Sequence, residues 1–188
     1  IMLENNDLDF SGWDLRKCLR LLMKSNAALL ERIQSPIIYQ ADTSFLNEIM
    51  AIATPCYSRR ATLHHYLGLA KRSYSDIIDN KQYKLKKFFY ALRAATACRW
   101  IITKDKMPPI EFQNMLYVLN IDESIIKRIE SLIELKATIS ESYLHEGDGE
   151  ILEFINDNII HARKQAGDLP VAICDIEKLN TFFIKSLP

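Results

Sequence analysis

The stretch YKLKKFFYALRAATACRWIIT, residues 83–103, restricts the fold of this chain more than any other feature. It carries the strongest helical pattern in the sequence, and Pro108 and Pro109 end that pattern. The whole chain of 188 residues holds only 5 glycines and 6 prolines. That is too few for a collagen-like chain, a linker-rich chain or an all-β chain with many turns. The sequence therefore predicts a mainly helical protein.

Helical periodicity recurs along most of the chain. Residues 12–24 place apolar side chains at the i, i+3, i+4, i+7 spacing of an amphipathic helix, with Ser11 as the expected N-cap. Short strands are expected at 8–10 and 35–40, where apolar and β-forming residues dominate. Further helices are predicted at 27–33, 43–53, 58–79, 110–119, 123–144, 151–166 and 174–187. The predicted architecture is a helical bundle joined to a small strand-containing piece at the N-terminus.

The net charge of zero hides an uneven distribution. The segment 59–99 contains ten basic and two acidic residues, a net charge of +8. A local excess of this size suits a polyanion such as a nucleoside triphosphate or RNA. A solvated helix surface that happens to be basic explains the same count, and the charge alone does not separate the two readings.

The cysteines and the apolar runs indicate the compartment. Cys18, Cys56, Cys98 and Cys174 lie far apart without a CxxC pair, so the sequence does not support a zinc site. We expect all of them to be reduced, buried thiols in a cytoplasmic protein. No apolar run is long enough for a membrane span, and no signal peptide is visible.

Two aspartates precede the first predicted helix. Asp7 and Asp9 are spaced i, i+2, so in a strand they share one face and can hold a divalent cation through oxygen ligands. Solvation of a strand end explains the same pair. Lys17, Arg20 and Lys24 then form a basic stripe along the helix that follows. Such a stripe is either a solvated surface or a phosphate-binding one.

Several stretches together resemble a known family. The segments are LDFSGWDLRKCLRLLMKSNAALLERIQSPIIY (8–39), LHHYLGLAKR (63–72), LKKFFYALRAATACRWI (85–101) and PPIEF (108–112), with a looser echo at 132–141. In this order they resemble the predicted nucleotidyltransferases of the DNA polymerase beta superfamily that are associated with bacterial and phage RNA repair. The resemblance covers roughly residues 8–140.

This resemblance implies transfer of a nucleoside monophosphate from an NTP, with Mg²⁺ or Mn²⁺ as cofactor. Such enzymes use a small α/β domain with three carboxylates, two of them in an Asp-x-Asp that follows a Gly-Ser turn. Asp9 matches the third carboxylate, which binds the catalytic metal or helps to deprotonate the attacking hydroxyl. Residues 1–40 would be the C-terminal remnant of that domain, and 41–188 a helical domain.

The sequence departs from the family pattern in one respect. No Gly-Ser turn and no acidic pair precede Asp9. We therefore expect this chain to be inactive by itself and to come from a parent protein that is an enzyme.

The helix predicted at 83–103 carries the nucleotide-binding candidates. Lys86, Tyr90 and Arg93 share one face, and Lys87 runs beside them. Phosphates held by Lys87 and Arg93, with a base or ribose packed on Tyr90, would suit this face, and these residues match the characteristic helix of the family. In the alternative reading Tyr90 is part of the core and the cations are solvated. Lys17 is a further phosphate-binding candidate.

Other polar and aromatic residues have plainer explanations. His64 and His65 diverge by about 100° on a helix and so cannot both bind one metal in the usual i, i+4 manner. We expect one of them to be buried. Asn26 is expected to cap a helix. Lys136 either forms a salt bridge, which we favour, or contributes to the nucleotide site. Trp13 and Trp100 are expected as core anchors.

Three functions remain in competition on the sequence. The first is the nucleotidyltransferase, with an NTP and an RNA end or another nucleotide as partners, and with homo-oligomers left open. The second is a non-catalytic nucleic-acid-binding module that uses the basic segment 59–99. The third is a helical module that binds another protein. No membrane partner is expected.

Overall fold

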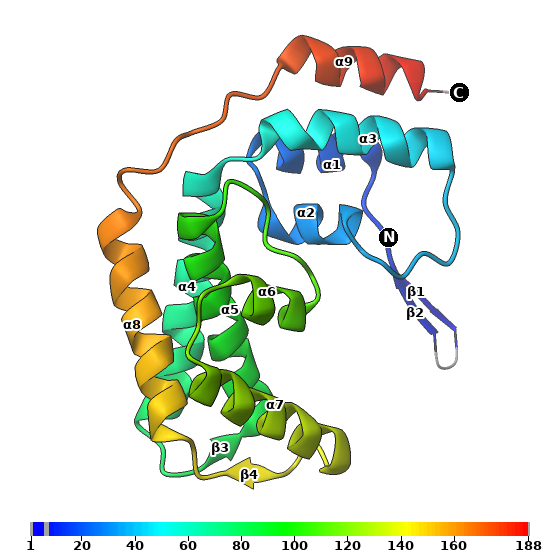
Figure 1. The fold of residues 1–188 in the computed structure, drawn as a ribbon. Helices are drawn as coiled ribbons and strands as arrows, with labels where there is room; N and C mark the ends of the chain where they lie inside the picture. Colours follow the sequence, from blue (N-terminus) through cyan, green and yellow to red (C-terminus); the bar gives the residue numbers. More distant parts are fainter. Residues whose placement is uncertain (1, 6–7, 188) are drawn as a thin grey trace. The chain divides into compact units, whose positions relative to one another are not determined.

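The computed structural model describes residues 2–5 and 8–187, with side chains from residue 11 onward. It is mainly helical, as predicted, with nine helices in the described part of the chain (Figure 1). The chain divides into two compact units. Unit 1 consists of Ile1–Ser58 and Ala172–Pro188, and unit 2 of Arg59–Val171. The expected domain boundary at residue 40 stays a prediction.

Unit 1 begins with an antiparallel hairpin. Strands β1 (Met2–Asn5) and β2 (Leu8–Ser11) pair with Glu4 opposite Asp9. The helices of the unit are α1 (Leu15–Met23), α2 (Ala27–Ile33), α3 (Thr43–Cys56) and α9 (Ile176–Lys185). Each begins at an Asp or Asn whose side chain accepts a hydrogen bond from a free backbone N–H. These N-caps are Asp14, Asn26, Asp42 and Asp175.

Two local predictions for unit 1 are wrong. Ser11 ends β2 rather than capping α1, because α1 begins only at Leu15, after Asp14, which accepts from the Lys17 N–H at 2.8 Å. Residues 35–40 form no strand. Pro36 lacks an N–H donor for a strand ladder, and the Tyr39 side chain is 98% exposed. This segment therefore lacks both a donor and a buried face that would favour a strand.

Unit 2 is built around three long helices that lie side by side (Figure 1). These are α4 (Arg59–Ile78), α5 (Leu85–Thr103) and α8 (Gly149–Gln165). Their facing sides form a core of fully buried residues, which includes Leu63, Phe88, Leu92, Ile101, Ile151 and Ile155. The shorter helices α6 (Phe112–Val118) and α7 (Glu123–Thr138) complete the unit. Each of these elements lies within or close to a helix predicted from periodicity.

A second antiparallel pair in unit 2 has no counterpart in the sequence predictions. Strand β3 (Tyr83–Lys84) pairs with β4 (Leu144–His145), although residues 83, 84 and 144 were expected to be helical. Tyr83 is 5% exposed, and burial, followed by the charge of Asp148, raises its pKa to about 12. Gly147 has φ +97°, and a Cβ there would lie 2.5 Å from the Tyr83 hydroxyl oxygen. Glycine is therefore required at this turn.

The expectation of four reduced cysteines is wrong for one pair. Cys56, at the end of α3, and Cys174, just before α9, form a disulfide with a Cα–Cα distance of 4.4 Å. The two residues are 118 positions apart, so no local pattern reveals that they meet. Cys98 is buried as expected, and burial raises its pKa to about 12.

We expect thiol counting to show this bond. Alkylation of the denatured but unreduced protein should label Cys18 and Cys98 only, because Cys56 and Cys174 are joined. Treatment with a reductant before alkylation should label all four cysteines, and intact mass spectrometry reports both counts. Four labels without reductant would show that the protein carries free thiols throughout.

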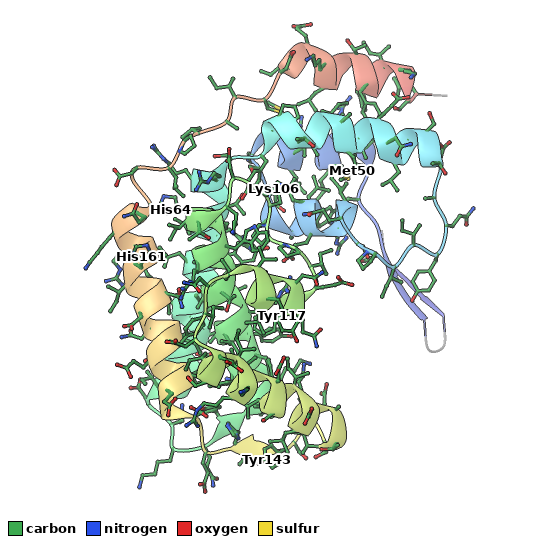
Figure 2. The ribbon with its side chains drawn as sticks, viewed as in Figure 1. Met50, His64, Lys106, Tyr117, Tyr143 and His161 are labelled. Atoms are coloured by element: carbon green, nitrogen blue, oxygen red, sulfur yellow. A yellow bond between two sulfur atoms is a disulfide. The ribbon has the colours of Figure 1, made fainter. Side chains whose placement is uncertain are left out.

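Neither His64 nor His65 is buried, which corrects the expectation for this pair. Figure 2 shows His64 on α4 and His161 on α8.

None of the helices in the described part of the chain combines the length and apolarity needed to cross a bilayer.

Candidate nucleotide-binding site

Four arginines of the basic segment 59–99 bind main-chain carbonyl oxygens. Arg59 donates to the carbonyl oxygens of Ile101 (2.7 and 2.9 Å) and Ile102 (2.8 Å), where α5 ends. Arg60 donates to the carbonyl oxygens of Gly167 (2.7 Å) and Leu169 (2.8 Å), after α8. Carbonyl groups near a helix C-terminus have no intrahelical partner, and a guanidinium satisfies them well.

The two arginines on α5 also donate to main-chain carbonyl oxygens. Arg93 donates to the Ile110 carbonyl oxygen at 2.5 Å, and Arg99 donates to that of Asn120. Both bonds attach a loop flanking α6 to α5. Much of the local charge excess thus supports the fold of unit 2 rather than forming an unoccupied basic surface.

A pocket of about 380 Å³ lies against the face of α5 that holds Tyr90. This volume falls within the range of small-molecule sites. The wall is formed by α5, the start of α6, α7 and the turn that follows α7. It combines aromatic rings, three cations, an amide and one carboxylate: Phe89, Tyr90, Phe112, Lys86, Arg93, Lys136, Gln113, Glu141 and the apolar Ile133.

The two lysines of this pocket make only weak, solvent-exposed contacts. Lys86 Nζ lies 3.4 Å from Glu141 Oε1, and Lys136 Nζ lies 5.1 Å from the centroid of the Phe89 ring. Ion pairs between exposed groups contribute about 0–1 kcal/mol, so an incoming phosphate can replace the Glu141 carboxylate at little cost. The pocket therefore offers an anionic, ring-containing ligand both cations and aromatic surface.

The structure brings together two of the predicted nucleotide-binding residues. Tyr90 and Arg93 both line the pocket, and Tyr90 is 51% exposed rather than part of the core. Lys87 does not line it, since its Nζ lies 3.6 Å from Asp76 Oδ2. Its neighbour Lys86 lines the pocket instead. Lys17 belongs to unit 1 and is described there on its own.

Lys136 lines this pocket, which is the less favoured of the two readings that the sequence offered for it. We expected a salt bridge, but among the described residues Lys136 has no carboxylate partner and contacts the Phe89 ring. Its position became apparent only when α7 was placed beside α5. A basic residue at helical spacing from Ile129 and Ile133 was the only available sign.

Unit 1 contains a cluster of cations around an aromatic ring. Arg32 Cζ lies 4.2 Å and Lys17 Nζ 5.3 Å from the centroid of the Trp13 ring. Trp13 is only half-buried, whereas Trp100 is 8% exposed and donates to the Lys106 carbonyl oxygen at 3.1 Å. The expectation of a core anchor thus holds for Trp100 and not for Trp13. Sequence reasoning did not single out Arg32.

The aspartates predicted to bind a metal are only partly described by the structure. Asp9 lies in β2, but its side chain is outside the described residues, and Asp7 is itself outside them. Among the described residues, no three His, Cys, Asp or Glu side chains are grouped so that they could hold a metal ion. The described part therefore does not supply a metal centre.

Comparison with known proteins identifies the family. The family model described as "RlaP: RNA repair pathway DNA polymerase beta family" matches residues 2–185. The chain is also 32% identical over 181 residues to "Uncharacterized protein YcgL" of Bacillus subtilis (strain 168), which covers 96% of this chain and 70% of that protein. No solved structure matches the chain. The match across nearly the whole sequence shows that the chain belongs to the RlaP family, the RNA repair pathway DNA polymerase beta family.

Proposed function

We propose that the full-length protein is a nucleotidyltransferase that moves a nucleoside monophosphate from an NTP to an RNA end or another nucleotide acceptor. The observation that carries this proposal is the pocket on α5. Within a family of RNA repair proteins, it places Tyr90 and Arg93 beside further cations and aromatic rings in a volume that suits a nucleotide.

The residues of the pocket have distinct roles in this proposal. Tyr90 and Phe112 supply flat apolar surface against which a base or ribose packs. Lys86 and Lys136 bind phosphate oxygens as mobile point charges. Arg93 is oriented by its bond to the Ile110 carbonyl oxygen and so presents its remaining N–H groups in a fixed direction.

The proposed reaction also needs a divalent cation. Mg²⁺ or Mn²⁺ neutralises phosphate charge and activates a hydroxyl in enzymes of this type, and Asp9 is the residue we assign to it. Among the residues that the structure describes, no group of side chains could hold this ion. The activity is tested with the full-length protein, Mg²⁺ or Mn²⁺, each NTP radiolabelled on the α-phosphate, and RNAs with defined ends. Label on the RNA supports the proposal, whereas the absence of transfer under every combination contradicts it.

The neighbouring lysines of α5 provide a sharp test of the pocket. We expect Lys86→Gln to weaken NTP binding by about 1–3 kcal/mol, the cost of losing a charge-assisted contact. Lys87→Gln is the matched control, because both side chains are 51% exposed and each lysine forms one ion pair of its own. Only Lys86 lines the pocket. Calorimetric titration of each variant with each NTP, without RNA, measures the effect.

The two lysines also separate two assignments of the phosphate contact. The sequence-based prediction assigns it to Lys87, whereas our proposal assigns it to Lys86, which lines the pocket. A loss of affinity in Lys87→Gln alone would support the sequence-based assignment. If both variants bound NTP as tightly as the unmodified chain, this pocket would not be the NTP-binding site.

A further inference from the structure

The outer face of α1 is a row of cations without carboxylate partners. Leu19 and Leu22 are buried on the inner face, and helix geometry places Lys17, Arg20 and Lys24 on the opposite side, where all three are exposed. None of these three has a carboxylate within ion-pair distance among the described residues. This differs from Lys86, Lys87 and the arginines of unit 2 described above, which are engaged by carboxylates or main-chain oxygens.

Several acidic residues of unit 1 have partners of their own. Asp14 and Asp42 accept hydrogen bonds from backbone N–H groups at the starts of α1 and α3. Asp175 does the same at the start of α9. Glu48 pairs with Lys185 at 2.7 Å. The cations of α1 thus keep their charge available to an external anion.

Trp13 orders the cations at one end of the row. Arg32 Cζ and Lys17 Nζ both lie over its ring, at 4.2 and 5.3 Å from the centroid. Contact with an indole face restricts these long side chains, so less conformational entropy is lost when they bind a ligand. A guanidinium plane and an indole ring are also the surfaces on which unpaired RNA bases stack.

We propose that this α1–α2 surface, formed by Trp13, Lys17, Arg20, Lys24 and Arg32, binds the backbone of single-stranded RNA. The row from Lys17 to Lys24 extends about 10 Å at 1.5 Å per residue, so it contacts consecutive phosphates rather than a single anion. Its exposed face is charged and rich in lysine, a residue that the cores of protein–protein interfaces disfavour. The proposal rests on the proposed function in so far as RNA is the acceptor.

The test compares two triple variants that each lose three positive charges. The first is Arg20→Gln, Lys24→Gln, Arg32→Gln, which leaves Lys17 in place because it is also an NTP-binding candidate. The control is Arg72→Gln, Lys81→Gln, Lys84→Gln, whose positions are exposed members of the 59–99 segment. Fluorescence anisotropy with labelled oligouridylate measures RNA binding over a range of salt concentrations, without NTP or metal. Far-UV circular dichroism checks that each variant is folded.

We expect the α1–α2 variant to bind this RNA roughly tenfold or more weakly at low salt, and its salt slope to fall by about 2, since each single-strand phosphate contact contributes about 0.7. The control variant should retain most of its RNA affinity and most of its salt slope. Equal losses in the two variants would mean that only net charge matters, and a loss confined to the control would place the RNA on segment 59–99. Either result overturns this surface.

The same experiment separates this surface from the enzymatic proposal. RNA binding that depends on the α1–α2 surface, in a full-length protein that transfers no nucleotide, would uphold the surface and reject the nucleotidyltransferase. Nucleotide transfer to RNA, together with unaltered RNA binding in the α1–α2 variant, would uphold the nucleotidyltransferase and reject this surface.

Discussion

Asp9→Asn in the full-length protein is expected to abolish metal-dependent nucleotide transfer. The substitution keeps the size of the side chain but removes the charge that would hold a divalent cation. Loss of a partner that merely orients a metal ligand already costs 10- to 100-fold, so we expect a loss of more than about 100-fold for a ligand itself. Transfer of α-phosphate label to RNA, measured over a series of Mg²⁺ and Mn²⁺ concentrations, reports the effect.

Asp14→Asn is the matched control for this experiment. Asp14 lies five positions further along and accepts the Lys17 N–H at 2.8 Å as the N-cap of α1. Asparagine caps a helix about as well as aspartate, so this variant should keep both its fold and its activity. Normal transfer by Asp9→Asn would remove Asp9 from the metal site. Equal loss in both variants would show that the carboxylates act through the fold of this segment.

Phe88→Ala is expected to lower the free energy of unfolding by about 3–5 kcal/mol, the usual cost of removing a buried aromatic ring. Phe88 is 0% exposed and lies on the core face of α5. Its ring is stacked on Tyr83 at a centroid distance of 5.8 Å and meets the edge of His145 at 5.9 Å. It therefore supports both α5 and the β3–β4 pair. Urea denaturation followed by circular dichroism measures the loss.

The adjacent Phe89 gives the complementary variant. Phe89 lines the pocket and lies under Lys136, whose Nζ is 5.1 Å from the ring centroid. Phe89→Ala should cost less stability than Phe88→Ala but should weaken NTP binding. If both substitutions lowered stability equally and left nucleotide affinity unchanged, the two faces of α5 would not have the separate roles assigned to them here.

Local patterns in the sequence were sufficient to locate the helices. The spacing of Leu15, Cys18, Leu19 and Leu22 predicted α1, and Asn26 was correctly expected to begin α2. Apolar periodicity and N-cap residues act within one or two turns, so they can be read without knowing what the helix packs against. The family could also be identified from the sequence, because its motifs are short segments in a fixed order.

The use of each charged or sulfur-containing side chain was decided by tertiary structure. Lys86 and Lys87 are adjacent in sequence, yet one lines a pocket and the other pairs with Asp76. The partner of Cys56 lies 118 residues away. Arg59 and Arg60 contribute to an apparent basic surface in the sequence, but in the fold they bind the end of α5 and the segment after α8.

The sequence by itself therefore determined the helical class, the approximate helix positions and the family. Tertiary structure alone decided which cations remain available to a ligand, because a long charged side chain takes whichever carbonyl, carboxylate or ring the fold brings within reach.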